Sequence, residues 1–361
     1  MADVDAAVES LALPPELLAA ISAPAGGRVT LVIGAGASFE SPTAIPLAGR
    51  CSEDAYRRLV ADEILEADRC KKPWDLTAVA DAVHEATGGQ AALVERLPLS
   101  KFRKAEPNSG YLLAAALLRE GAIASVLSLN FDRAMENALM AVGAADDVVV
   151  IRGPEDGATF GSNNVVYLHR TVDHLPDEWI LRSDSLTTAW SDAWEEAVTQ
   201  RTLTTQFVVF AGLGSEAKVL TETAKKLKTM LGHSVSAIQV DPTPFGPSEF
   251  SAALEIAEDA YLEIGWCDFM ARLGNRVLIE HIAALRKSFA AAEQDRDGNF
   301  ESADILRQLD AMGLVAVGGL RARWMLSPGP YETARNWLPT YVAQILLGLV
   351  SMASITDLDV V

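Results

Sequence analysis

The sequence lacks the features that define several large classes of protein. Only three cysteines occur among 361 residues, and none forms a C-x-x-C pair, so a zinc ribbon is not expected. The most apolar run, near the C-terminus, contains Gln344 and is shorter than the roughly 18 residues that a membrane-spanning helix needs. The acidic N-terminus also lacks the basic start of a secretion signal or transit peptide. These absences favour a cytoplasmic location.

Positive charge is also scarce. There are 30 Lys and Arg residues against 49 Asp and Glu residues, which gives a formal net charge of −19. A surface of this sign repels nucleic-acid phosphates and anionic lipid headgroups. We therefore expect no direct nucleic-acid partner and no membrane partner.

What the sequence does contain is a series of apolar segments that alternate with helical ones. The segments at 29–33, 123–129, 207–211 and 235–241 are rich in Val, Ile, Leu and Phe. Strands that are apolar throughout and alternate with helices are typical of a parallel sheet covered on both faces. The sequence therefore predicts an α/β fold with a Rossmann-like parallel sheet and helices on both faces.

Changes in composition indicate how the chain is divided. Residues 1–27 form an acidic N-terminal lead-in with one short helix, and residues 28–289 form the main α/β domain. Within that domain, residues 50–105 have helical spacing and predict a helical insertion after the first strand, with Ser52 as an N-cap. Residues 290–361 begin with a polar linker and predict a small C-terminal α/β or winged-helix-like appendage.

Two of the expected strands end in glycines, "GAGAS" at 34–38 and "GLGS" at 212–215. Glycine lets the backbone approach a pyrophosphate, and a helix that begins there would add N–H donors. The alternative is a tight turn without a ligand. Phe39 stands where the dehydrogenase fingerprint needs a third Gly or Ala, and no Gly-Lys-Ser/Thr follows. Neither a dehydrogenase nor a P-loop is therefore expected.

Polar residues that can carry chemistry follow other strands. Asn130 and Asp132 follow one strand, and His169 ends another. Asp241 ends a third strand, where it can accept hydrogen bonds from ribose hydroxyls. Ligands bind at the carboxyl ends of parallel strands, and histidine is the natural general base near neutral pH. Each residue also has a structural alternative: Asp132 can cap the next helix, His169 can be structural, and Asp241 can be a turn residue.

Taken in order, these motifs resemble the sirtuin family, and most of all the bacterial sirtuin-like domains of antiphage defence systems. The resemblance covers about residues 28–270. "AIP" at 44–46 is similar to the family's "GIP" segment, with Ala44 in place of glycine. Arg170 also stands where the family usually has glycine, beside His169, where an arginine can close the pocket or contact a phosphate.

The resemblance implies an enzyme that uses NAD as its substrate. It implies that Asn130 orients the nicotinamide ribose and the attacking water. It further implies that Asp132 supports the nicotinamide pocket and that His169 acts as general base. The residues implied to hold the dinucleotide are Gly34, Ala35, Gly36, Ser38, Pro46, Gly212, Gly214, Ser215 and Asp241.

The sequence lacks the four-cysteine zinc module that deacylase sirtuins commonly use. The resemblance therefore points to a zinc-independent NAD glycohydrolase, without a metal, that produces nicotinamide and ADP-ribose. It implies a regulated effector of antiphage defence that depletes NAD in abortive infection. It also implies a homo-oligomer and a partner ATPase or nuclease encoded nearby. The alternative is a non-catalytic NAD- or ADP-ribose-binding scaffold subunit of a defence complex. Transfer of ADP-ribose or removal of acyl groups would need a groove for a second substrate.

Overall fold

A seven-stranded parallel sheet forms the centre of the protein, as the sequence predicts. The computed structural model describes residues 13–21, 29–119, 121–161, 163–188, 194–213, 223, 225–229, 235–246 and 249–274. The strand order is β3-β4-β2-β1-β5-β6-β7, and each pair of neighbours is parallel. The strands are β1 (Val29–Ile33), β2 (Ser125–Ser128), β3 (Val149–Ile151), β4 (Asn164–Tyr167), β5 (Phe207–Ala211), β6 (Ser236–Asp241) and β7 (Tyr261–Glu263).

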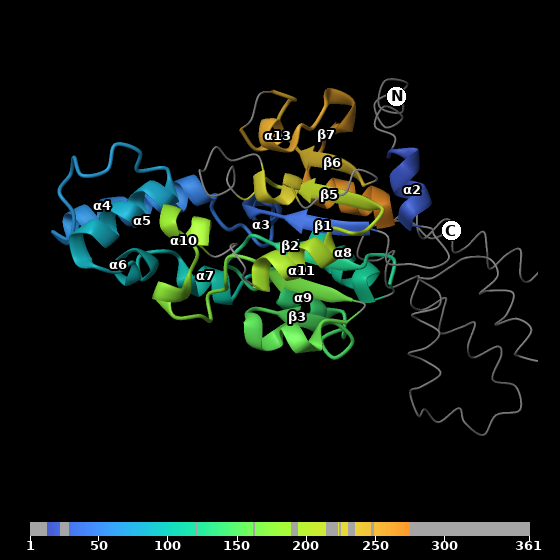
Figure 1. The fold of residues 1–361 in the computed structure, drawn as a ribbon, viewed down its shortest axis with the longest axis horizontal. Coiled ribbons are helices and arrows are strands. Elements are labelled where there is room, and N and C mark those ends of the chain that lie inside the picture. Colours follow the sequence, from blue (N-terminus) through green and yellow to red (C-terminus); the bar gives the residue numbers. More distant parts are fainter. Residues whose placement is uncertain are drawn as a thin grey trace, which may run out of the picture.

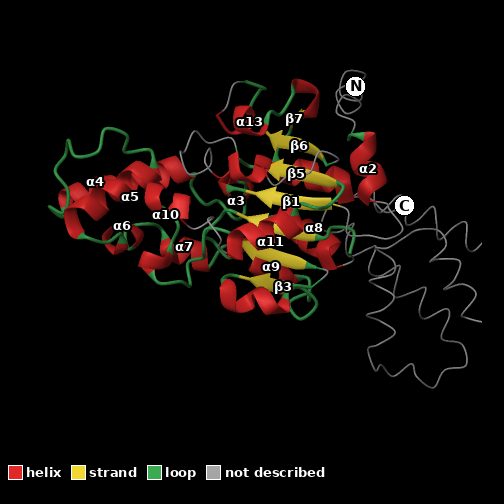
Figure 2. Cartoon of the chain, in the orientation of Figure 1, coloured by secondary structure: helices red, strands yellow, loops and turns green. Residues whose placement is uncertain are grey.

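Helices cover both faces of the sheet, so each central strand contributes to two cores (Figure 2). In β1, Leu31 packs into the larger core and Val32 into the smaller one. This burial on both faces is the reason that the sequences of the central strands are apolar at consecutive positions. Residues of α2 (Pro15–Ile21), α8 (Ser109–Arg119) and α9 (Ala134–Ala141) belong to the larger core, and residues of α11 (Trp194–Thr202) and α13 (Glu249–Leu254) to the smaller one.

The expected helical insertion lies beside the sheet, facing the carboxyl ends of the strands (Figure 1). It contains α4 (Ala48–Ala61), α5 (Leu76–Thr87), α6 (Ala91–Val94) and α7 (Leu99–Arg103). The prediction that Ser52 caps the first of these helices is wrong. The helix begins at Ala48, because Cys51 N–H already donates to the carbonyl oxygen of Leu47 at 3.0 Å, and Ser52 lies buried inside it.

A distant segment completes this helical module. Gln90 Nε2 donates to the carbonyl oxygens of Pro176 and Trp179 at 2.8 and 2.7 Å. Ser183 Oγ donates to Asp81 Oδ2 at 2.8 Å, which joins α10 (Ser183–Thr188) to α5. These bonds tie the chain after β4 to the insertion after β1. The remaining short helices are α3 (Ala35–Phe39), η1 (Pro154–Thr159), η2 (Pro176–Glu178) and η3 (Glu258–Ala260).

The glycine turn after β1 contacts the glycine turn after β5. These two strands are neighbours at the point where the order of strands in the sheet reverses: β2 and β4 lie on one side of β1, and β5 and β6 on the other. Gly36 N–H donates to the carbonyl oxygen of Gly212 at 2.9 Å. A Cβ on Gly36 would lie 2.6 Å from Gly212 Cα, and a Cβ on Gly212 would overlap the backbone nitrogen of Ala37. Both glycines are therefore required by the contact between the two turns, whether or not a ligand binds.

Several expectations fall outside the described residues. They are most of the lead-in at 1–27, of which only 13–21 is described and contains the expected short helix, and the appendage at 290–361. Within the part of the chain that the structure describes, no helix is long and apolar enough to cross a membrane.

We expect Gly212→Ala to destabilise the protein more than Gly88→Ala. Both glycines have a positive φ, 66° and 80°, but nothing lies within 4 Å of a Cβ built on Gly88. The Gly88 variant should lose about 1 kcal/mol from the free energy of unfolding, through backbone strain alone. The Gly212 variant should lose about 2 kcal/mol more, because its Cβ also overlaps the neighbouring turn. Urea unfolding measures both, and equal losses would contradict a tight contact between the turns.

Candidate functional site

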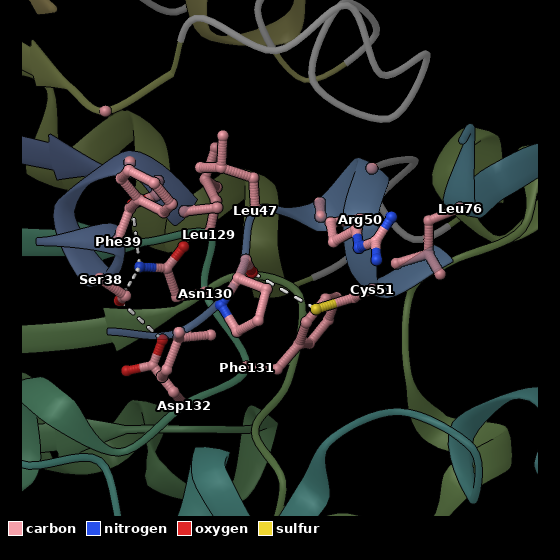
Figure 3. A pocket seen from close by; sticks show the side chains of 18 of the residues that line it. Ser38, Phe39, Leu47, Arg50, Cys51, Leu76, Leu129, Asn130, Phe131 and Asp132 are labelled. Atoms are coloured by element: carbon pink, nitrogen blue, oxygen red, sulfur yellow. Dashed lines mark hydrogen bonds between the residues drawn. The ribbon is translucent and has the colours of Figure 1, made fainter. Parts of the chain in front are cut away.

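A cavity of about 560 Å³ lies between the carboxyl ends of the strands and the helical module (Figure 3). One wall comes from the ends of β1, β2, β5 and β6, and the other contains apolar residues such as Leu47, Leu76 and Phe102. Gly214 and Ser215 lie outside the described residues. The other ten expected site residues all line the cavity: Gly34, Ala35, Gly36, Ser38, Pro46, Asn130, Asp132, His169, Gly212 and Asp241.

Four buried polar side chains form a connected cluster on the wall formed by the strand ends. Ser38 Oγ lies 2.8 Å from Asp132 Oδ2 and 2.7 Å from the Tyr111 hydroxyl. Asn130 Nδ2 lies 3.1 Å from both Ser38 Oγ and the Tyr111 hydroxyl, and it donates to the carbonyl oxygen of Gly34 at 3.0 Å. The cluster therefore joins the turn after β1, the turn after β2 and helix α8.

Asp132 contacts both the start of the next helix and the polar cluster. Its Oδ1 accepts a hydrogen bond from Ala134 N–H at 2.9 Å at the start of α9, while its Oδ2 accepts one from Ser38. Burial raises the pKa of Asp132, and the hydrogen bonds from Ala134 and Ser38 oppose that rise. One carboxylate thus stabilises a helix start and anchors the polar cluster.

Tyr111 and Asn108 were not singled out from the sequence. Asn108 Nδ2 donates to the carbonyl oxygen of Ala37 at 2.8 Å, and its Oδ1 accepts from Tyr111 N–H at 3.1 Å. The Tyr111 ring packs edge-on against Trp266, with ring centroids 5.9 Å apart. The only available signal was a single tyrosine in an otherwise aliphatic helix, "YLLAAALL", and that pattern also fits a core residue.

His169 faces the cavity but is almost completely buried, with 1% of its surface exposed. Its Nε2 lies 3.2 Å from Thr223 Oγ1. Burial lowers the pKa of His169 from 6.5 to about 4; a hydrogen bond with the Leu129 backbone opposes this change, and the charge of Arg170 adds to it. The imidazole is therefore neutral at pH 7.

Arg170 does not close the cavity. Its Nη1 donates to Glu195 Oε1 at 2.9 Å, and its guanidinium lies over the Trp194 ring, 5.2 Å from the centroid. Arg170 has a φ of 75° and Ala44 a φ of 45°. Both residues stand where the family that the motifs resemble has glycine, and glycine adopts positive φ without strain. Both substitutions therefore act on the backbone, and the arginine side chain is directed to α11.

At the other end of the cavity, Asp241 has its expected position at the end of β6. Its Oδ1 accepts hydrogen bonds from Thr243 N–H at 3.0 Å and from Thr243 Oγ1 at 2.5 Å. The structural alternative, a turn residue, is thus realised, and Asp241 lines the cavity as well. In the described part of the chain, no group of three or more His, Cys, Asp or Glu side chains is placed to hold a metal ion. The absence of a metal stays a prediction.

Comparison with known proteins gives structural likenesses only. No protein-family description matches the sequence. No curated protein matches it either. Among solved structures, the chain is similar to a Sir2 homologue in complex with NAD, at 15% identity and a TM-score of 0.40, over 72% of this chain and 91% of that one. It is also similar to a Sir2 homologue variant with ADP-ribose (17%, TM-score 0.42, 73% and 96% covered) and to Sir2 bound to an acetylated peptide (16%, 0.38, 72% and 96%).

The buried histidine predicts a pH dependence of stability. Below pH 6.5 the unfolded state takes up a proton on this histidine, whereas native His169 stays neutral until about pH 4. The free energy of unfolding therefore falls as the pH falls through this window. Between pH 7 and pH 4.5 we expect the wild type to lose about 2.5 kcal/mol more than His169→Gln, which has no such titration. Urea unfolding at the two pH values measures this, and equal losses would contradict a neutral buried imidazole.

The ion pair on α11 predicts a second stability effect. Arg170→Gly removes backbone strain but leaves the Glu195 carboxylate, which is 2% exposed, without its partner. We expect a loss of about 3 kcal/mol in the free energy of unfolding. The double variant Arg170→Gly with Glu195→Gln should recover most of it, because the buried charge is gone. If the double variant is as unstable as the single one, the ion pair is not the reason for the loss.

Proposed function

We propose that this chain binds NAD in the cavity and hydrolyses it to nicotinamide and ADP-ribose. The observation that carries the proposal is the buried cluster of Ser38, Tyr111, Asn130 and Asp132. Three of its members, Ser38, Asn130 and Asp132, line the same cavity of about 560 Å³ as neutral His169. That volume is within the range of small-molecule sites, and the cavity lies at the reversal of strand order, where parallel α/β proteins bind ligands.

The distribution of polar groups fits an extended dinucleotide. The cluster around Asn130 lies at the ends of β1 and β2, and Asp241 lies at the end of β6. The glycine turns after β1 and β5 lie between these two strand ends, because the sheet order runs β2-β1-β5-β6. A dinucleotide, which has a ribose on each side of a central diphosphate, matches this order.

The main contribution of the glycine turns would be to let the diphosphate of the ligand come close to the protein backbone. Gly36 N–H already donates to Gly212, and Ala37 N–H donates to the carbonyl oxygen of Gly34 at 3.0 Å. These two N–H groups are engaged within the protein, so few backbone donors in this turn are left for a diphosphate. Arg50 also lines the cavity, and its exposed guanidinium can supply positive charge to that group.

Hydrolysis of NAD requires little acid–base catalysis from the protein. The bond between the ribose carbon and nicotinamide breaks with its electron pair moving to the pyridinium ring, so nicotinamide leaves as a neutral molecule. Positive charge develops on the ribose, water adds to that carbon, and a proton is lost to a base. The Asn130 carbonyl can stabilise that charge and position the water. His169 can take the proton, because water attached to a cationic carbon is strongly acidic.

A second function is favoured by the same hydrogen bonds. Asn130 Nδ2 and Ser38 Oγ are engaged within the protein, His169 Nε2 contacts Thr223, and a pKa of about 4 makes His169 a weak base. A site in this state suits a subunit that binds NAD or ADP-ribose without cleaving it. The observation that separates the two functions is the fate of bound NAD.

The direct test is nicotinamide release from NAD by the purified protein, followed by chromatography over a range of protein concentrations. We expect Asn130→Ala to slow release at least about 100-fold. Asn137→Ala is the matched control, because Asn137 donates to the carbonyl oxygen of Ala105 at 2.8 Å and is outside the cavity lining. Its release should stay close to the wild-type rate.

Three results are informative. Loss of release in the Asn130 variant alone supports the hydrolase. NAD that binds by calorimetry and remains intact favours the non-catalytic subunit. Failure to bind NAD at all contradicts both functions.

The biological setting rests on the resemblance of the motifs alone. We propose a cytoplasmic effector of antiphage defence that acts as a homo-oligomer and depletes NAD in abortive infection. A partner ATPase or nuclease encoded nearby belongs to the same proposal. Removal of acyl groups and transfer of ADP-ribose stay the less favoured activities.

A further inference from the structure

We propose that Tyr111 is a positioning residue that links the charge of Asp132, through Ser38, to the amide of Asn130. In this arrangement Asp132 acts through the relay and not on the substrate directly. The inference rests on the proposed function for its activity assay, but the hydrogen-bond directions follow from the cluster alone.

The directions are set by Asp132. An ionised carboxylate can only accept hydrogen bonds, so the single proton of Ser38 Oγ points to Asp132 Oδ2 at 2.8 Å. Ser38 Oγ can then only accept from Tyr111, so the tyrosine O–H donates across 2.7 Å. With its proton used, the Tyr111 oxygen accepts from Asn130 Nδ2 at 3.1 Å. The chain runs from Asn130 through Tyr111 and Ser38 to Asp132.

The relay settles which way the amide of Asn130 faces. The carbonyl oxygen of Gly34 can only accept, so it holds one hydrogen of Asn130 Nδ2 at 3.0 Å. The second hydrogen points to the hydroxyls of Tyr111 and Ser38. All described bonds of this side chain involve Nδ2, which leaves Oδ1 for the cavity, on the side of the amide away from Ser38 (Figure 3).

Tyr111 is built to stay in this position. Its side chain is 1% exposed, its ring packs against Trp266, and its backbone N–H is held by Asn108 Oδ1. Burial, together with the nearby charge of Asp132, raises the pKa of Tyr111 well above 10, so the hydroxyl keeps the proton that it donates. Removing this hydroxyl would leave Ser38 without one of its two donors and Asn130 without one acceptor.

The test compares Tyr111→Phe, Asp132→Asn and their combination in the full chain. The Ser38 hydroxyl and Ala134 N–H donate to different oxygens of Asp132, and asparagine places an NH₂ group, which cannot accept, at one of these two positions. Each single variant should lower kcat about 30-fold and change KM for NAD by less than about 3-fold, because it misplaces one group without removing the binding surface. The double variant should be no slower than the slower single variant, because both break the same relay.

Tyr167→Phe is the matched control. Tyr167 is fully buried in the same core, and its hydroxyl has no hydrogen-bond partner among the described residues. Loss of that hydroxyl should leave kcat unchanged. Losses that multiply in the Tyr111 and Asp132 double variant, or a wild-type kcat in Tyr111→Phe, would overturn the relay.

A second readout separates the relay from the proposed function. The side-chain NH₂ signals of Asn130, assigned by their loss in Asn130→Ala, should shift in Tyr111→Phe and Asp132→Asn but not in Tyr167→Phe. If they shift while the wild type releases no nicotinamide, the relay stands and the hydrolase proposal fails. If they do not shift, the relay is wrong whatever the activity.

Discussion

The cavity depends on the contact between two bare backbone turns, one after β1 and one after β5. Gly36 and Gly212 come so close that neither can carry a Cβ, and a hydrogen bond of 2.9 Å joins them. This contact brings the start of α3 against the end of β5 and holds Ser38 at a defined position beside the turn after β2. Without it, Ser38 would not be held in place to meet Asn130 and Asp132. The two glycines are therefore required by the shape of the protein itself.

The polar cluster shows how few groups can serve several purposes. Asp132 stabilises the start of α9 with one oxygen and orders Ser38 with the other. Tyr111 is a core residue of α8 and also supplies the hydroxyl that lies between Ser38 and Asn130. A buried polar network of this kind is stable only when each member has a partner. The same residues therefore support secondary structure and hold the cluster together.

Local patterns predicted the central strands well because β1, β2, β4 and β5 are buried along their whole length. Helix starts were predicted less well. Ser52 has the side chain of a typical N-cap, yet α4 begins at Ala48, because an N-cap preference contributes only about 1 kcal/mol and does not fix a helix start. β7 and α11 had no clear signal in the sequence, since β7 is only three residues long and most residues of α11 (WEEAVTQRT) are polar. Arg170 could not be placed either, because its partner Glu195 lies 25 positions away.

For the site, the sequence by itself determined which residues end the strands, and parallel strands bring their carboxyl ends to one edge. That is why Asn130, His169 and Asp241 come to one cavity. Only the tertiary structure decided what each side chain does there. It brought the hydroxyl of Tyr111, from an otherwise aliphatic helix, to Asn130, and it directed Arg170 toward α11. It also buried His169 deeply enough to lower its pKa to about 4. The reason is physical: a hydrogen bond or a desolvated charge depends on neighbours that the chain supplies from distant positions, and local spacing carries no record of them.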